Sequence, residues 1–229
     1  MEKRDSKIEL YKWQLDAYSR IRGQNAVLSA PTGAGKTVVA YLWANLLDIE
    51  GNTTLPKAKR IIFTSPIKAL SNERYMDLRK MGFDVGIETG DFKRNEEAQI
   101  ICCTQEIYTM KYTRQPGQML IIDEFHYIFN DSDRARAYID GIKNTHSDTV
   151  ILVMSATFGS VKAVGRYLSK VAIRRFTIYE SRERMTRLLF VPDTPMTFKT
   201  VHNALIFLFS QRGTFDLAFQ IAQNRKKLS

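Results

Sequence analysis

The stretch SAPTGAGKTVV, residues 29–39, decides the fold of this protein. A short apolar run at 26–29 precedes it, and a helical pattern follows from Thr37. A strand, a glycine-rich turn and Lys-Thr opening a helix is the order of a phosphate-binding loop. Gly33 and Gly35 let the backbone N–H groups turn toward the phosphates, and the start of the helix adds its positive dipole end. The residues predicted to hold a nucleotide are Pro31, Thr32, Gly33, Ala34, Gly35, Lys36 and Thr37.

A second half-site supports this prediction. In MLIIDEFH, residues 119–126, an apolar strand ends in Asp123 and Glu124. An acid at the carboxyl end of a parallel strand lies at the ligand crevice of such a sheet. We expect Lys36 to reach the β- and γ-phosphates, and Thr37 and Asp123 to bind Mg²⁺. Glu124 is then placed to orient or activate the attacking water, so Glu124, Lys36 and Asp123 are the predicted catalytic residues of an ATP hydrolase.

The charge balance points to a polyanion. Lys and Arg number 34 against 24 Asp and Glu, a net charge of +10. Between Lys162 and Arg187 there are eight basic and two acidic residues, so this segment holds six of the ten net charges. A basic stripe is the usual footprint of a nucleic-acid partner, and a merely solvated surface is the alternative.

The cysteines and the hydropathy of the chain bear on whether it has disulfides, a metal site or a membrane segment. Cys102 and Cys103 are adjacent in the apolar run QIICCT, and neighbours on a strand face opposite sides, so we expect neither a disulfide nor a metal site there. The start of the chain, MEKRDSKIEL, has no apolar signal core, and no window approaches 18 uninterrupted apolar residues. We expect a cytoplasmic protein with no membrane partner.

Strand-like runs alternate with helical patterns along most of the chain, which predicts an α/β fold around a mostly parallel sheet. The expected strands are 26–29, 60–65, 85–88, 98–103, 118–123 and 149–154. The expected helices are 37–48, 67–81, 105–112, 133–145 and 160–170. Near the end, 188–191 reads as a further strand and 214–223 as a helix, and ALIFLF at 204–209 fits a strand or a buried helical turn.

Six motifs in order resemble those of superfamily 2 helicases. The likeness is strongest to the DExH group, which contains the superkiller-type RNA helicases and the related archaeal DNA helicases. APTGAGKT (30–37) is similar to motif I, in which alanine at the first position is usual, and DEFH (123–126) to motif II. SPIKALSNERY (65–75), TGD (89–91), TQEIY (104–108) and SAT (155–157) are similar to motifs Ia and Ib, the next strand-binding motif and motif III. The resemblance implies a RecA-like P-loop NTPase domain.

The resemblance also implies roles for residues outside the phosphate loop. Gln14, 22 residues before Lys36, corresponds to the family's adenine-reading glutamine, and a Gln amide both donates and accepts. His126, Ser155 and Thr157 are implied to couple the nucleotide site to the nucleic-acid face. Contacts to single-stranded RNA or DNA are implied for Ser65, Pro66, Lys68, Asn72, Thr89, Gly90, Thr104 and Gln105.

Helicases of this superfamily place ATP between two RecA-like domains, and the second supplies an arginine to the transferred phosphoryl group. Only 34 residues follow Pro195, and no QxxGRxGR-like stretch is among them. ALIFLFSQRGTFDLAFQIA resembles the opening strand and helix of that second domain. We therefore expect a first motor domain at 1–191 and the linker and start of a second at 192–229, with a complete second domain as a partner in cis or in trans.

Three questions stay open on the sequence. The domain is expected to belong to a helicase, with a DNA translocase or CRISPR-associated nuclease–helicase as the enzyme alternative. A regulatory module that binds nucleic acid or a helicase partner without turnover is the third possibility, against which intact Lys36, Asp123 and Glu124 argue. Residues 182–187 resemble a strap of superkiller-type enzymes but have Met185 where proline is expected, so the role of these arginines stays open. The choice between RNA and DNA also stays open, because contacts to phosphates do not distinguish the two sugars.

Overall fold

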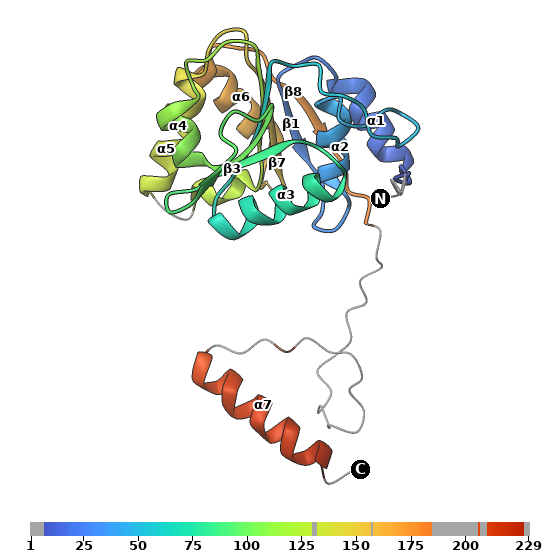
Figure 1. Cartoon of the computed structure of the whole chain (residues 1–229), viewed down its shortest axis with the longest axis vertical. Helices are drawn as coiled ribbons and strands as arrows, with labels where there is room; N and C mark the ends of the chain where they lie inside the picture. Colours follow the sequence, from blue (N-terminus) through green and yellow to red (C-terminus); the bar gives the residue numbers. More distant parts are fainter. Residues whose placement is uncertain (1–6, 130–131, 157, 185–205, 207–209, 227–229) are drawn as a thin grey trace. The chain divides into compact units, whose positions relative to one another are not determined.

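The computed structural model describes residues 7–129, 132–156, 158–184, 206 and 210–226, with side chains placed as far as residue 223 in the last helix (Figure 1). The chain divides into two compact units, Met1–Thr186 and Arg187–Ser229. The first unit holds every predicted site residue.

The described part of the first unit is built on an eight-stranded sheet with the order β4-β3-β5-β2-β6-β7-β1-β8. Every neighbouring pair is parallel except β3 and β4. The mostly parallel α/β fold predicted from the alternating pattern is confirmed. The strands are β1 Ala26–Ser29, β2 Arg60–Ser65, β3 Val85–Glu88, β4 Lys93–Arg94, β5 Ile100–Thr104, β6 Gln118–Ile122, β7 Val150–Ser155 and β8 Thr177–Glu180.

Helices cover both faces of this sheet, as the ribbon shows (Figure 1). Buried side chains of α1, α2 and α3 belong to one apolar cluster, and those of α4, α5 and α6 to a second. Parallel strands need such crossover helices, and a sheet covered on both faces is apolar on both. The helices are α1 Lys12–Ile21, α2 Lys36–Trp43, α3 Lys68–Lys80, α4 Gln105–Lys111, α5 Ser132–Asn144 and α6 Val161–Ala172, with a 3₁₀ turn, η1, at Phe125–Phe129.

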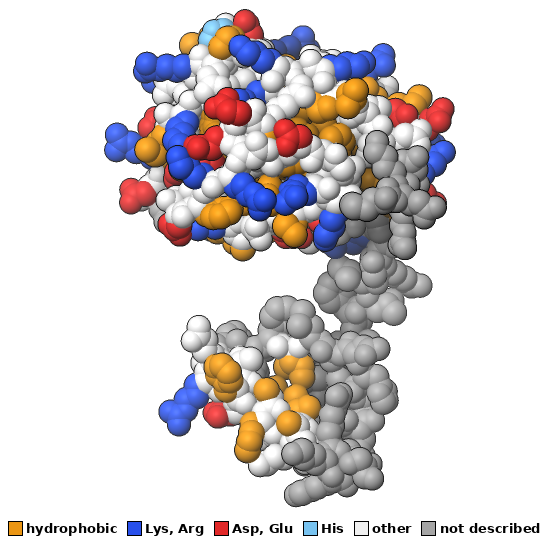
Figure 2. All heavy atoms as spheres, in the orientation of Figure 1, with side chains coloured by type: hydrophobic (Ala, Val, Ile, Leu, Met, Phe, Trp, Pro, Cys, Tyr) orange, Lys and Arg blue, Asp and Glu red, His pale blue; other side chains and the backbone are white. Residues whose placement is uncertain are grey.

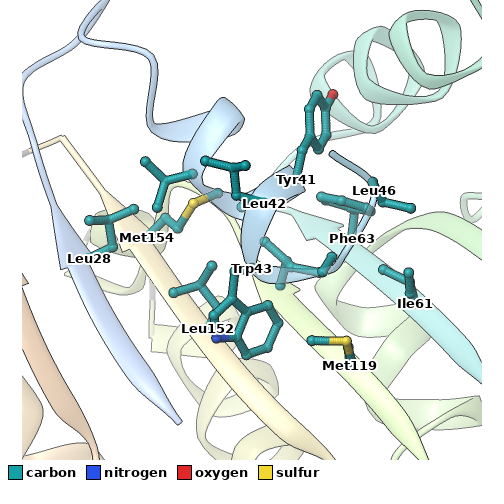
Figure 3. Packing of buried hydrophobic residues seen from close by; sticks show 14 of the residues in the cluster. Leu28, Tyr41, Leu42, Trp43, Leu46, Ile61, Phe63, Met119, Leu152 and Met154 are labelled. Carbon is teal, nitrogen blue, oxygen red and sulfur yellow. The ribbon is translucent and has the colours of Figure 1, made fainter. Parts of the chain in front are cut away.

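Alternate residues of the central strands point to opposite faces of the sheet and pack into the two apolar clusters. Cys102 lies in the first and Cys103 in the second, and both thiols are free and buried, as the sequence predicts. Figure 3 shows the first cluster, with Trp43 and Tyr41 of α2 packed toward the strands. The Tyr41 hydroxyl points away from the apolar side chains (Figure 3), and this becomes important at the nucleotide site.

Several expected boundaries are wrong. The helix expected at 37–48 ends at Trp43, because Asn45 adopts a left-handed conformation with φ 54° that stops it. Leu47 instead pairs in an antiparallel bridge with Thr53. It is still buried, so the apolar pattern of the sequence continues beyond the end of the helix. The strand expected at 98–103 begins at Ile100. Helix α1 and strand β8 were not among the expected elements, because polar and charged residues interrupt their apolar patterns.

In the second unit the structure describes one helix, α7 Gln211–Lys226, which confirms the helix expected at 214–223. Phe215 and Phe219 are exposed on it, and hydrophobic side chains are visible on its surface (Figure 2). The strand expected at 188–191, most of the run 204–209 and the second half of the strap-like segment 182–187 lie outside the described residues. No helix in the described part of the chain is both long and apolar enough to cross a membrane.

Candidate nucleotide site and nucleic-acid face

The phosphate-binding loop joins β1 to α2. Gly33 and Gly35 have φ of 76° and 89°, a left-handed conformation that favours glycine. A Cβ added at Gly35 would lie 2.5 Å from Nε2 of Gln14, so this glycine is also needed for space. Helix α2 begins at Lys36, directly after this turn, so its first N–H groups face the loop.

Lys36 is folded into the loop. Its Nζ donates to the carbonyl oxygens of Ala30 at 3.0 Å and Pro31 at 3.3 Å, and the residue is only 8% exposed. Burial lowers the pKa of Lys36, although Glu124 and Asp123 act in the opposite direction. A buried ammonium needs acceptors, and phosphate oxygens are the stronger ones.

Asp123 and Glu124 follow β6 at the same end of the sheet. The Asp123 N–H donates to the Thr64 carbonyl at 2.9 Å, and Asp123 Oδ1 accepts from the Glu124 N–H at 2.9 Å. Glu124 has φ 49°, a strained conformation for a side-chain residue and one found at functional sites. These contacts fix the backbone at both residues and the direction of the Asp123 carboxylate.

The Glu124 carboxylate is poorly satisfied. Its Oε2 is buried without a hydrogen-bond donor, and its nearest cationic neighbour, His126 Nδ1 at 3.2 Å, is an ion-pair partner only when protonated. Burial, followed by the charge of Asp123, raises the pKa of Glu124. An unsatisfied acceptor facing a phosphate site is suited to hold a water molecule.

An arginine that the sequence analysis did not single out joins the predicted metal ligands. Arg74 of α3 donates through Nη2 to Thr37 Oγ1 and to Asp123 Oδ2, both at 3.1 Å, and through Nη1 to the Tyr41 hydroxyl at 3.0 Å. Burial alone would lower the pKa of Arg74, but Tyr41 and Asp123 raise it overall. The signal was present, because Arg74 lies at helical spacing from the buried residues Ser71 and Leu78.

His126 and Ser155 meet beside the loop. Strand β7 lies between β6 and β1, so its end, Ser155, is placed between the two halves of the nucleotide site. The Ala30 N–H donates to the Ser155 carbonyl at 3.3 Å, and His126 Nδ1 is 3.2 Å from Ser155 Oγ. Thr157, the third predicted coupling residue, lies outside the described residues.

A pocket of about 370 Å³ opens between the loop, α3 and the turn after β6. Glu124 and His126 are among the residues that line it. The remaining lining residues are Thr32, Leu70, Tyr127 and Ala156.

Gln14, the predicted adenine reader, is buried between α1 and the loop. Its Oε1 accepts from the Tyr11 N–H at 2.9 Å, and its Nε2 donates to the Gly35 carbonyl at 3.1 Å. With 1% exposure, the amide ties α1 to the phosphate loop in this structure. Base recognition by Gln14 stays a prediction.

The predicted nucleic-acid residues gather at the carboxyl ends of β2, β5 and β3, three neighbouring strands. Ser65 and Thr104 are partners in the β2–β5 register, and Thr89 follows β3. Lys68 and Asn72 of α3 are exposed, Lys68 pairs with Asp91, and Gly90 is exposed beside it. Five of the set are largely buried, namely Ser65, Pro66, Thr89, Thr104 and Gln105.

Gln105 contacts the protein rather than solvent. It is 0% exposed, and a Cβ added at Gly141 of α5 would lie 2.6 Å from its Nε2. The Gln105 side chain is therefore not free to contact a nucleic-acid strand, and a contact by the backbone at the start of α4 stays a prediction.

The basic segment divides into two parts. Lys162, Arg166 and Lys170 form one exposed row on α6, at four-residue spacing. Arg174 instead donates to the carbonyl oxygens of Thr149, Thr145 and His146 at 2.6–2.8 Å. Its guanidinium therefore stabilises the loop between α5 and β7. Within its described part, residues 162–184, the segment therefore does not present all of its basic side chains to a polyanion.

With this geometry in place, comparison with known proteins decides the family. Residues 11–164 match the family model described as DEAD/DEAH box helicase. The chain belongs to this family. The resemblance to DExH helicases is confirmed.

Curated relatives are long helicases. The helicase domain is 34% identical over 154 residues to the DExH-box ATP-dependent RNA helicase DExH9 of Arabidopsis thaliana, covering 65% of this chain and 15% of that protein. It is 32% identical over 196 residues to Superkiller complex protein 2 of Mus musculus, covering 82% of this chain and 15% of that protein. The matched part of the chain thus spans about 15% of the length of these two relatives.

Solved structures show the same fold. The chain matches the DUF1998 helicase MrfA with a TM-score of 0.69 at 19% identity, over 97% of this chain and 39% of that chain. S. cerevisiae Dbp5 bound to RNA and ADP BeF₃ gives a TM-score of 0.57 at 20% identity, over 75% of this chain and 46% of that chain. The RecA-like fold predicted from the motifs is confirmed.

Proposed function

We propose that residues 1–191 are the first motor domain of an ATP-dependent RNA helicase and that 192–229 begin a second RecA-like domain. One observation carries the proposal: Thr37 and Asp123, from separate motifs, converge on a single cationic group beside Lys36 and the unsatisfied Glu124. A constellation of this kind suits phosphoryl transfer from ATP to water. A regulatory module without turnover has no need of it.

The residues present fit Mg²⁺. Thr37 and Asp123 offer a hydroxyl and a carboxylate oxygen, the hard ligands that Mg²⁺ prefers. Arg74 Nη2, 3.1 Å from both oxygens, shows that the pair already holds a cation. When bound with ATP, the metal would neutralise charge on the β- and γ-phosphates. Among the described residues no group of three or more His, Cys, Asp and Glu gathers as a metal site, so phosphate oxygens are expected to complete the coordination.

The protein's own residues have distinct tasks in this proposal. Lys36 exchanges the Ala30 and Pro31 carbonyls for phosphate oxygens. Glu124 accepts a hydrogen bond from the attacking water and orients it, with the strained backbone and buried setting holding its carboxylate in place. His126 and Ser155 transmit the change toward the strand ends that bear the nucleic-acid residues.

We infer that the nucleic acid is single-stranded RNA. Relatives that share up to 34% identity are named ATP-dependent RNA helicases, among them DExH9 and DExH15 of Arabidopsis thaliana. Hydroxyls, amides and Lys68 at neighbouring strand ends would follow the sugar–phosphate backbone without reading sequence. DNA is the other arm of the experiment below.

The first test is steady-state ATP hydrolysis by this chain, with and without single-stranded RNA or DNA, with nucleotide binding measured in parallel. We expect ATP–Mg²⁺ binding with slow turnover, since an arginine from a second domain contributes ~10³–10⁵ in rate. Glu124→Gln should bind nucleotide and lose the residual turnover. Glu97→Gln, at a side chain 96% exposed, is the matched control and should behave as the parent.

The outcomes separate the parts of the proposal. Absence of nucleotide binding contradicts the motor-domain assignment. Equal turnover in Glu124→Gln and the parent contradicts the role of Glu124. Strong stimulation by nucleic acid, lost in Glu124→Gln, supports the site but contradicts the requirement for an arginine from a second domain. Stimulation by DNA but not RNA contradicts the choice of RNA.

A further inference from the structure

Arg74 occupies the position that the proposed function gives to a metal ion. Its Nη2 is 3.1 Å from Thr37 Oγ1 and 3.1 Å from Asp123 Oδ2, and these two oxygens are the predicted Mg²⁺ ligands. The side chains of Arg74 and Asp123 are each 16% exposed, so this is a largely desolvated ion pair.

We propose that Arg74 is a built-in cation that occupies the Mg²⁺ position of the nucleotide-free site and must leave it when Mg²⁺ binds with the nucleotide. The inference rests on the proposed function, because it uses the assignment of Thr37 and Asp123 as metal ligands. It adds to that function a residue that sets the metal dependence of nucleotide binding.

Electrostatics explains why a cation is needed in the nucleotide-free state. Asp123 lies beside Glu124, whose carboxylate is buried and repels it. A buried carboxylate without a partner costs several kcal/mol in general, and breaking such a pair exposes that cost. Arg74 satisfies Asp123 as long as no metal is present, and Asp123 Oδ1 is taken by the Glu124 N–H.

Geometry makes the two cations exclude each other. Mg²⁺ lies about 2.0–2.1 Å from its ligand oxygens, and it requires near-octahedral coordination. A guanidinium nitrogen within hydrogen-bond distance of both oxygens fills the space between them, and two positive groups there would repel. Simultaneous occupation of the site by Arg74 and Mg²⁺ is therefore unfavourable, and Mg²⁺ binding requires the guanidinium to leave.

Arg74 has a second anchor that does not involve the metal ligands. Its Nη1 donates to the Tyr41 hydroxyl at 3.0 Å, and its guanidinium lies 5.7 Å from the centre of the Tyr41 ring. Tyr41 is one turn after Thr37 on α2, and its hydroxyl points away from the apolar cluster (Figure 3). This contact holds the side chain close to the site.

The exchange links the nucleotide site to the nucleic-acid face. Arg74 shares α3 with Lys68 and Asn72, which are exposed and predicted to contact the strand. Release of Arg74 removes a direct bond between α3 and the strand that bears Asp123. Binding of Mg²⁺ with nucleotide thereby changes a restraint on the helix that carries the nucleic-acid residues.

The test is a titration of fluorescent ADP onto this chain at a series of Mg²⁺ concentrations, beginning in EDTA. Arg74→Met keeps the aliphatic stem and removes the competing charge. We expect the Mg²⁺ concentration for half-maximal enhancement of ADP binding to fall about tenfold if Arg74 leaves the site free about one tenth of the time, because apparent affinity is reduced in proportion to the competent fraction. The gain should depend on Mg²⁺, with no comparable rise of ADP affinity in EDTA.

Two further variants keep the test decisive. Arg79→Met is the matched control, because Arg79 is on the same helix and also contacts a tyrosine, Tyr75, at 3.2 Å, without reaching a metal ligand. It should leave the Mg²⁺ dependence unchanged. If Arg74→Met fails to fold, Tyr41→Phe carries the test, because it removes one anchor of Arg74 and should shift the dependence in the same direction by a smaller factor.

The proposal is overturned by an unchanged Mg²⁺ dependence in folded Arg74→Met, which would make Arg74 a structural residue. It is also overturned by a loss of ADP affinity both in EDTA and in Mg²⁺, which would make Arg74 a phosphate ligand. Failure of the parent chain to bind ADP at any Mg²⁺ concentration would instead contradict the proposed function, and this inference with it.

Discussion

At the scale of single residues, the polar groups of the nucleotide site are satisfied by the chain itself. Lys36 bonds loop carbonyls, Arg74 bonds Thr37 and Asp123, and Gln14 bonds the Gly35 carbonyl. Buried polar groups need such partners, so a ligand-free site that folds must provide them. Nucleotide binding then exchanges one set of bonds for another, and Glu124 Oε2 is the exception that lacks a partner in advance.

Gly35→Ala tests the loop at this scale. Alanine at φ 89° costs about 1–2 kcal/mol, and its Cβ would also lie 2.5 Å from Gln14 Nε2. The Gln14 amide must then move together with the loop. We therefore expect a lower free energy of unfolding and a dissociation constant for the nucleotide that is at least about tenfold higher. Thermal unfolding and fluorescent-ADP titration measure the two effects.

Gly82→Ala is the matched control. Gly82 has φ 90° and no atom within 4 Å of an added Cβ, so only the backbone cost applies. It should lower stability by a similar backbone cost and leave ADP affinity unchanged. Equal ADP affinity in both variants would show that the packing of Gly35 on Gln14 does not matter for the loop.

At the scale of elements, α3 has two faces with different tasks. Ser71, Tyr75 and Leu78 are buried, and Arg74 lies on the same inward side. Lys68 and Asn72 face solvent near the carboxyl ends of the strands. One helix thereby contacts the proposed nucleotide site and carries two residues that are proposed to contact nucleic acid, because side chains three and four apart share a face and the others do not.

Gly141→Ala tests the packing of α5 on α4. Alanine normally stabilises a helix interior by about 1 kcal/mol relative to glycine. Here the added Cβ would lie 2.5 Å from Thr109 Oγ1 and 2.6 Å from Gln105 Nε2, so we expect a net loss of about 1–3 kcal/mol from overpacking. Denaturant unfolding measures the change, and displacement of Gln105 should also weaken RNA binding.

Gly165→Ala on α6 is the control for this helix prediction. Its added Cβ would meet Cδ1 at 2.7 Å and Cγ1 at 2.9 Å of one side chain, the half-buried Ile178 on the edge strand β8, whereas the Cβ at Gly141 meets two different side chains. We expect Gly165→Ala to be clearly less destabilising than Gly141→Ala. The reverse order would contradict the tight approach of α5 to α4.

At the scale of the whole molecule, a net charge of +10 gives the chain a general attraction for polyanions. Figure 2 shows Lys and Arg interspersed with Asp and Glu on the visible face of the first unit. Nucleic-acid affinity should therefore come from a few placed cations at the strand ends, and from a general attraction that salt screens.

Lys68→Ala tests this electrostatic prediction. Loss of one phosphate contact should weaken single-stranded RNA binding and reduce the slope of log K against log salt by about 0.7. Lys80→Ala is the matched control, because Lys80 is also exposed, also paired with an aspartate, and at the other end of α3. Binding titrations at several KCl concentrations measure both, and equal slopes for the two variants would contradict the placement of the strand at the end of α3 that bears Lys68.

The sequence by itself determined the P-loop, the acids after β6 and the mostly parallel sheet. These follow from residue order and apolar periodicity, which are local properties. Only the tertiary structure decided that Arg74 lies between Thr37 and Asp123, that Gln105 is buried against Gly141, and that Arg174 bonds carbonyls. Such contacts join residues far apart in the chain, and no pattern of neighbouring residues reports which distant groups the fold brings within hydrogen-bond distance.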